Sequence, residues 1–242
     1  MNPDRRDLLI GGAYLLVFVW LWLMIKHTFQ GQQLVVMHES LLELYITTLS
    51  WMLLGALPFF VRRIADMPLA AWASFAALAA SMAMLLVGHS VVFNPAIDQS
   101  FVPGWPVFNV LLLGFILPAV LLGLICQRLD KKLRTYFELA SYVLLFVGVT
   151  MLVKHAFQGS VLTLRTLTDI EDYGYSAAWL VLALATMSVG IVRDNSHVRY
   201  ASLAVLLLVV MKVFLLDMSG LAGLWRVASF FGLGISPVSY TH

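Results

Sequence analysis

Long runs of apolar residues, separated by short polar stretches, follow one another along the whole chain. Eight runs can be drawn, at about residues 8–25, 44–61, 69–93, 107–126, 136–153, 176–192, 200–216 and 227 to the end. A helix needs about 20 apolar residues to cross a bilayer, where each segment must satisfy its own backbone hydrogen bonds. The runs do not alternate in polarity as barrel strands do. The pattern therefore predicts an all-α polytopic transmembrane bundle of about eight helices.

Composition supports a membrane protein and excludes an internal disulfide. Of the 242 residues, 61% are hydrophobic and 12% are charged, whereas a soluble domain carries about 25% charged residues. Cys126 is the single cysteine, so no internal disulfide or cysteine metal cluster can form. The first run is too long for a signal peptide and ends in Lys26-His27 without a small-residue cleavage site, so we interpret it as a retained helix.

The positions of Lys and Arg predict the orientation in a bacterial inner membrane. With a cytoplasmic N-terminus, ten of these residues fall inside and five outside, which agrees with the positive-inside rule. The inner ten are Arg5, Arg6, Arg62, Arg63, Arg128, Lys131, Lys132, Arg134, Arg193 and Arg199, and the outer five are Lys26, Lys154, Arg165, Lys212 and Arg226. The rings of Tyr45, Trp105, Tyr173 and Trp225 are then expected near the outer interface.

An internal repeat is visible at an offset of 128 residues. Residues 8–61 fall on 136–189 without a gap, and Lys-His-x-Phe-Gln-Gly occurs at 26–31 and again at 154–159. The later part aligns more weakly, at an offset of 120. Four helices per copy is an even number, so we predict two parallel repeats, with a pseudo-axis along the membrane normal. The predicted units are residues 1–127 and 128–242, the last helix being truncated.

Several short motifs carry a family resemblance. They are Phe93-Asn94-Pro95, Val107-Phe108-Asn109, Leu117-Pro118-Ala119, Arg199-Tyr200 and the stretches 211–217 and 221–234. Together they resemble the domain-of-unknown-function 2339 family of large, many-helix bacterial membrane proteins. The resemblance implies a bacterial membrane protein and implies no activity. Members of that family are usually longer, so the chain resembles their C-terminal part only.

The repeated polar residues form the first candidate site. Lys26, His27, Lys154 and His155 follow the outer ends of two helices, while Glu43, Tyr45, Glu171 and Tyr173 open the next helices. One interpretation is a polar pocket at the outer interface, where His and Glu move a proton or hold a head group. The other is a structural clamp, in which Lys complements the helix C-terminus. The clamp explains why both copies carry the residues. In either case we expect Glu171 to contact Lys154 or His155, and Glu43 to contact Lys26 or His27.

A second candidate cluster lies near the end of the seventh run. It consists of Lys212, Asp217 and Arg226. Because a buried charge in a membrane is costly unless it is paired, we expect a Lys212–Asp217 or Asp217–Arg226 pair that closes the loop. The alternative is a charged lining of an outward-facing cavity.

Metals, cofactors and nucleic acid are not predicted. No His spacing on one helix matches a metal motif, and no nucleotide fingerprint occurs. The basic cluster at 128–134 is better explained as a contact with anionic lipid than with nucleic acid. The predicted partner is therefore the lipid bilayer.

Three classes of function remain open from the sequence. In each case we expect an integral membrane protein that serves the cell envelope. Composition does not assign it an activity. An enzyme acting on a lipid-linked substrate could use His27, Glu43, His155 and Glu171. A transporter would need polar residues near the bilayer midplane, whereas these lie at the outer interface. A scaffold would need none of them.

The last residues are expected not to belong to the natural protein. A helix from Val227 ends at about Ser236, before Pro237. At 1.5 Å per residue it reaches about 15 Å, which is half of a hydrocarbon core of about 30 Å. We therefore expect residues from about Val238 to His242 to be foreign, with a short re-entrant helix as the alternative.

Overall fold

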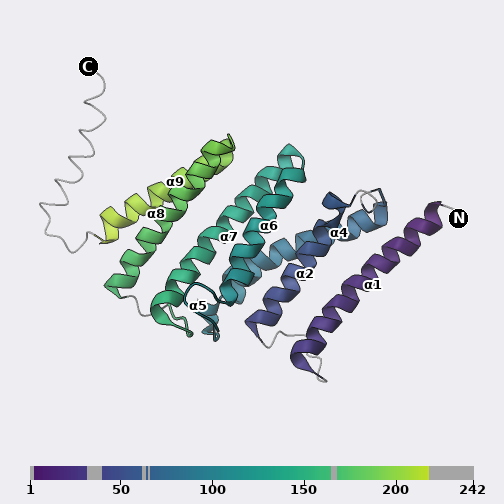
Figure 1. Ribbon diagram of the computed structural model, residues 1–242, viewed down its shortest axis with the longest axis horizontal. Coiled ribbons are helices and arrows are strands. Elements are labelled where there is room, and N and C mark those ends of the chain that lie inside the picture. The colour runs from purple at the N-terminus through teal and green to yellow at the C-terminus, as the bar shows by residue number, and fades with distance from the viewer. Residues whose placement is uncertain (1–2, 32–39, 62–63, 65, 165–167, 218–242) are drawn as a thin grey trace, which may run out of the picture. The chain divides into compact units, whose positions relative to one another are not determined.

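The computed structural model describes residues 3–31, 40–61, 64, 66–164 and 168–217, and apart from two isolated bridges its regular structure there is helical (Figure 1). The α-helices are α1 (Pro3–Gln30), α2 (Leu41–Phe60), α4 (Pro68–Ala83), α5 (Pro95–Asp98), α6 (Leu117–Ile125), α7 (Lys131–Gln158), α8 (Asp169–Val192) and α9 (Ser196–Lys212). Three π-helical segments are η1 (Met84–Val92), η2 (Leu112–Ile116) and η4 (Val213–Asp217), and η3 (Cys126–Arg128) is a 3₁₀ turn.

Six helices in the described part of the chain are long and apolar enough to cross a membrane. They span Asp7–Gln30, Leu41–Phe60, Pro68–Asp98, Leu133–Gln158, Asp169–Val192 and Ser196–Asp217, and a shorter apolar helix covers Leu112–Arg128. The predicted all-α transmembrane bundle is thus confirmed. The first seven predicted runs each overlap one of these helices. The eighth run, from residue 227, and the C-terminal residues 238–242 lie outside the described residues.

The fourth helix begins later than the sequence pattern predicts. The run was expected from residue 107, but the Trp105 amide donates to the Phe108 carbonyl at 3.0 Å and forms a turn. The Asn109 side chain then accepts from the Leu111 amide at 2.9 Å. An Asn side chain that satisfies an early helix amide marks the N-terminus of a helix, so the apolar residues before Asn109 are not helical.

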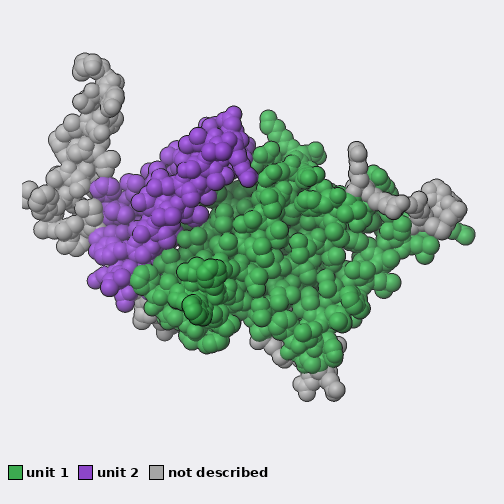
Figure 2. Space-filling model, viewed as in Figure 1, with its two compact units in different colours: residues 1–166 green, residues 167–242 purple. Residues whose placement is uncertain are grey.

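The chain divides into two compact units, residues Met1–Thr166 and Leu167–His242 (Figure 2). In the first unit, α2 packs against α1 and α4, and α6 packs against α7. Its core includes the fully buried side chains of Tyr45, Met52, Phe115 and Leu122. In the second unit α8 packs along α9. Helix α7, which opens the second predicted repeat, thus belongs to the first compact unit.

Two prolines inside helices leave a carbonyl for a neighbouring helix to bind. Proline has no amide hydrogen, so the carbonyl four residues earlier loses its α-helical donor. Pro58 lies four residues after Leu54, whose carbonyl accepts from the Tyr14 hydroxyl of α1. Pro118 lies four residues after Gly114, whose carbonyl accepts from the ring of His89 at 3.1 Å. These side chains tie helices together where the backbone ladder is interrupted.

Corresponding helices of the two copies begin 128 residues apart, the same separation as between the repeated sequence motifs. Helices α1 and α7 begin at residues 3 and 131, α2 and α8 at 41 and 169, and α4 and α9 at 68 and 196, each pair 128 residues apart. Gly31 and Gly159 follow α1 and α7 with φ angles of 65° and 77°, a backbone conformation that glycine adopts without strain.

Candidate functional site

The candidate polar residues of the first unit lie toward one end of its helices. The C-terminal ends of α1 and α7, the start of α2 and the short helix α5 lie at this end (Figure 1). Lys26 of α1 and Glu43 of α2 form an ion pair there, with 2.8 Å between Nζ and Oε1 and side-chain exposures of 1% and 0%. Gln30 also donates to Glu43 Oε1, at 3.0 Å. This buried pair confirms the contact expected from the sequence.

His27 does not join this pair, contrary to the pocket that the motif suggested. Its ring is exposed, and Nδ1 lies 2.9 Å from the Gly31 carbonyl. Adjacent residues on a helix point in different directions, so when Lys26 faces α2, His27 must turn away. In the first copy, therefore, His27 is a cap of the α1 C-terminus.

His155, which corresponds to His27 in the second copy of the repeat, is buried, and both of its ring nitrogens have hydrogen-bond partners. The Asn109 amide nitrogen lies 3.2 Å from Nδ1, and the Val102 carbonyl lies 3.2 Å from Nε2. An amide nitrogen only donates and a carbonyl only accepts, so Nδ1 accepts from Asn109 and Nε2 donates to Val102. The Val102 amide also donates to the Ser160 carbonyl at 2.8 Å. His155 thus fastens the segment before η2 to the end of α7.

The two tyrosines of the repeat also differ. Tyr45 was expected at the outer interface, but its ring is fully buried and lies 4.7 Å from the ring of His89, measured between centroids. Tyr173 is exposed on α8. Tyr45 turns inward because η1 and η2 pack against this part of α2, where its ring meets His89 and Phe115. Hydropathy alone does not indicate this packing.

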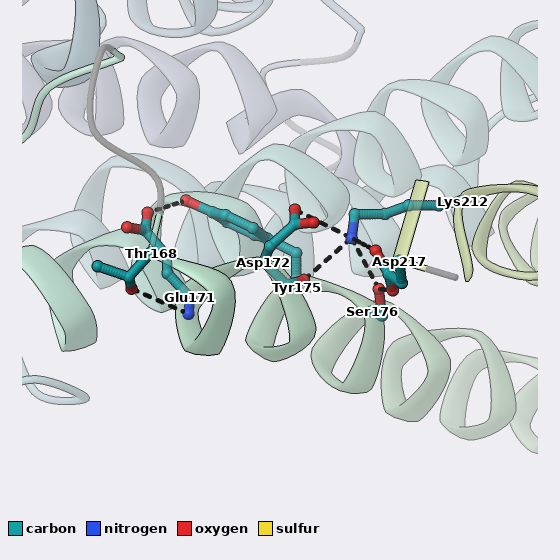
Figure 3. Close-up of polar contacts among 7 residues, drawn as sticks. All are labelled: Thr168, Glu171, Asp172, Tyr175, Ser176, Lys212 and Asp217. Carbon is teal, nitrogen blue, oxygen red and sulfur yellow. Dashed lines mark hydrogen bonds and ion pairs between the residues drawn. The ribbon is translucent and has the colours of Figure 1, made fainter. Parts of the chain in front are cut away.

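In the second unit, Lys212 is surrounded by oxygen atoms (Figure 3). Its Nζ lies 2.7 Å from Asp217 Oδ1, 3.1 Å from Asp172 Oδ1, 3.0 Å from the Asp172 carbonyl and 2.9 Å from Ser176 Oγ. Side-chain exposures are 9% for Lys212, 4% for Asp217 and 34% for Asp172. The predicted Lys212–Asp217 pair is confirmed. Arg226, the other predicted partner of Asp217, lies outside the described residues.

Glu171 belongs to the same helix turn but has a different partner. The Tyr175 hydroxyl donates to Glu171 Oε1 at 2.7 Å, and Thr168 caps the helix by accepting from the Glu171 amide at 3.3 Å. Lys154 is buried on α7 in the first unit, so the expected Lys154–Glu171 contact would join two units and stays a prediction.

Several polar residues were not identified from the sequence. Thr48 and His89 form a buried hydrogen bond of 3.0 Å in the first unit, and Ser176 and Asp217 form one of 2.7 Å in the second. Thr48 and Ser176 are 128 residues apart, and so are His89 and Asp217. The offset found at the start of each copy could therefore have located this pair, although His and Asp are not similar residues.

One pocket lies at the polar end of the first unit, with a volume of about 310 Å³. It is lined by Ser40, Leu41, Leu42, Leu44, Phe93, Asp98, Ser100, Phe101 and Pro103. Leu41 and Leu44 reach it from α2, whereas Glu43 of the same turn points to Lys26. Within the described ranges, no group of three or more His, Cys, Asp and Glu residues is placed to hold a metal ion.

Comparisons with known proteins give one match. A family model described as predicted membrane protein (DUF2339) matches residues 2–239. No curated protein and no solved structure matches the chain.

Proposed function

We propose that this chain, which belongs to the DUF2339 family of predicted membrane proteins, binds a lipid at the outer ends of its helices in a bacterial inner membrane. It is a multi-pass membrane protein with six candidate spans among its described residues. A cytoplasmic N-terminus is supported by the ten Lys and Arg residues on that side against five on the other. The pocket and the buried polar groups of the first unit then lie toward the periplasm.

The pocket at the start of α2 carries the proposal. Its volume of about 310 Å³ is at the lower end of the range of about 300–1,000 Å³ for ligand sites, enough for a head group or part of an acyl chain. Leucine and phenylalanine side chains supply apolar contact, while Ser40, Asp98 and Ser100 supply hydrogen-bond acceptors. None of the nine lining residues is cationic. The lining therefore favours a head group that donates hydrogen bonds, through hydroxyls or an amine.

The arrangement of the ionisable groups favours binding over catalysis. Glu43 is engaged with Lys26, and both ring nitrogens of His155 have hydrogen-bond partners. These groups hold helices and a connecting segment together, which supports the clamp interpretation. An enzyme acting on a lipid-linked substrate would need an acid or base directed into the pocket, and Asp98 is the one ionisable residue of its lining.

The proposed organisation remains a pair of parallel four-helix repeats, residues 1–127 and 128–242. Its support is the spacing of 128 residues shared by three pairs of helix starts and by the Thr48–His89 and Ser176–Asp217 hydrogen bonds. Local divergence, such as the burial of His155 and the exposure of His27, is then expected of copies that have acquired different neighbours.

Lipid binding is tested by filling the pocket. Leu42 lines it, while Leu53, on the same helix, is 52% exposed on the apolar surface. We expect Leu42→Trp, purified in nanodiscs from the native membrane, to lose most of the lipid that native mass spectrometry detects on the wild type. Leu53→Trp should retain it. Equal lipid occupancy in the two variants would contradict the proposal.

Orientation is tested separately with reporter fusions. Fusions after Arg63 and after Lys132 are expected to report the cytoplasm, and one after Gln33 the periplasm. A periplasmic signal after Lys132 would contradict the even number of helices before it. A cytoplasmic signal after Gln33 would reverse the assignment of the pocket to the outer side.

A further inference from the structure

His89 lies on η1 with no exposed surface, and both of its ring nitrogens face oxygen atoms. Nδ1 is 3.1 Å from the Gly114 carbonyl, and Nε2 is 3.0 Å from Thr48 Oγ1. A carbonyl oxygen only accepts, so Nδ1 carries a proton. Pro118 strengthens this assignment because it provides no α-helical amide to the Gly114 carbonyl.

The proton state of Nε2 depends on the Thr48 hydroxyl, which has two acceptors in reach. Thr48 Oγ1 lies 2.9 Å from the Leu44 carbonyl and 3.0 Å from His89 Nε2. A hydroxyl has a single hydrogen to donate. When it donates to Nε2, the imidazole is neutral. When it donates to the Leu44 carbonyl, its oxygen accepts from a protonated Nε2, and the ring is an imidazolium.

We propose that His89 is a proton-binding site inside the membrane-spanning part of the first unit. Uptake of one proton at Nε2 forms one N–H bond and requires only that the Thr48 hydroxyl rotate from Nε2 to the Leu44 carbonyl. Both states keep the hydrogen bonds of the ring to Gly114 and Thr48. Thr48 follows Leu41 by seven residues, which places the site about 10 Å along α2 from its start.

The residues around His89 are suited to a ring that is neutral in one state and positively charged in the other. The Tyr45 ring lies 4.7 Å from the His89 ring with an interplanar angle of 49°, and the Phe115 ring lies 6.2 Å away. An aromatic ring attracts a cation that lies over its face within about 6 Å, and the Tyr45 ring is inside this distance. The buried Tyr45 hydroxyl has no hydrogen-bond partner among the described residues.

Several ionisable groups on the neighbouring elements have partners other than His89. Glu43 of α2 is paired with Lys26, and Asp98 of α5 accepts from Ser100 at 2.6 Å. On α7, which also packs against η1, His155 binds Asn109 and Val102, and Lys154 is buried one residue before it. Tyr45 is thus the titratable side chain whose ring contact with His89 is established.

The second unit provides a comparison at the same repeat positions. There the hydroxyl of Ser176 donates to Asp217, and the ammonium of Lys212 lies 2.7 Å from that carboxylate. In the second unit the cation beside Asp217 is thus a side chain of the protein, Lys212. In the first unit, His89 stands at the position of Asp217 and Met84 at the position of Lys212, so a positive charge there would arrive as a proton on the imidazole. The two copies therefore differ in the source of the positive charge, which is a lysine side chain in the second unit and a proton taken up by His89 in the first.

The test is histidine nitrogen NMR of the full chain in nanodiscs between about pH 5 and pH 8, the range in which imidazole changes charge. The six histidines are assigned by comparison with His89→Gln. A neutral ring gives two widely separated nitrogen resonances and an imidazolium gives two similar ones. We expect the His89 resonances to pass reversibly from the neutral Nδ1–H pattern to the imidazolium pattern as the pH falls.

Two variants separate proton binding from a structural hydrogen bond. Thr48→Val should weaken proton binding at His89 by about tenfold, because hydrogen bonds to a charged group are worth more than those to a neutral one. Thr48→Ser should restore it, and Ser176→Ala in the second unit should leave it unchanged. Resonances of His89 that stay in one pattern across the whole pH range in the wild type would overturn the proposal.

Discussion

Removing the carboxylate of Glu43 should expose how strongly the buried ion pair holds α1 to α2. At 2.8 Å, two unit charges attract by about 6 kcal/mol with an effective dielectric constant of 20. Most of that is offset by the loss of hydration of both groups, but Glu43→Gln leaves the Lys26 ammonium buried without its counter-charge. Loss of one partner of a buried pair typically costs about 3–5 kcal/mol. We expect Glu43→Gln to lower the unfolding free energy by this amount.

The control uses an ion pair at the surface. Asp194 and Arg199 lie 3.2 Å apart with side-chain exposures of 91% and 39%, and such pairs contribute about 0–1 kcal/mol. Asp194→Asn makes the same chemical change as Glu43→Gln and keeps a residue that tolerates the left-handed φ of 46°. Both variants are unfolded in detergent with SDS or by heat. Equal losses of stability would refute the idea that Lys26 and Glu43 are a desolvated pair.

A double variant tests whether the pair is needed for stability at all. Lys26→Met combined with Glu43→Leu removes both charges and replaces them with apolar side chains of similar size. Replacing a buried ion pair in this way is often neutral or stabilising, so we expect the double variant to recover most of the stability lost in Glu43→Gln. If it is as unstable as the single variant, packing or the hydrogen bond from Gln30 dominates instead.

Three other changes have defined outcomes. Gly55→Ala would bring a Cβ within 2.7 and 2.9 Å of backbone atoms of α4, so we expect a loss of about 1–3 kcal/mol from overpacking; Gly12→Ala, which meets nothing within 4 Å, should be neutral or stabilising in the same melting assay. Asn109→Ala should raise amide hydrogen exchange in residues 101–109 while exchange in α2 stays unchanged; slow exchange in that segment would mean that Asn109 does not hold it. Lys212→Met should destabilise the second unit by leaving Asp217 uncompensated, and adding Asp217→Leu should reverse most of the loss; a loss that persists in the double variant would assign the effect to packing.

The sequence by itself determined the features that depend on local composition. Apolar runs of membrane-spanning length correspond to the described helices because a bilayer leaves a backbone no alternative to internal hydrogen bonding. The spacing of the repeated motif also predicted a contact between Lys26 and Glu43, since one ends a helix and the other begins the next. The Lys212–Asp217 pair followed from the cost of an unpaired charge in lipid.

The tertiary structure alone decided which face of each helix is buried. His27 and His155 occupy the same position of the same motif, yet one caps a helix end in solvent and the other holds a distant segment through Asn109 and Val102. Tyr45, expected at the interface, lies against His89 inside the first unit. The environment of a side chain in such a bundle depends on the neighbouring helix that it meets, and apolar periodicity is almost uniform around helices that face lipid as well as protein. For that reason the His89 site became visible only when η1, η2 and α2 were seen together.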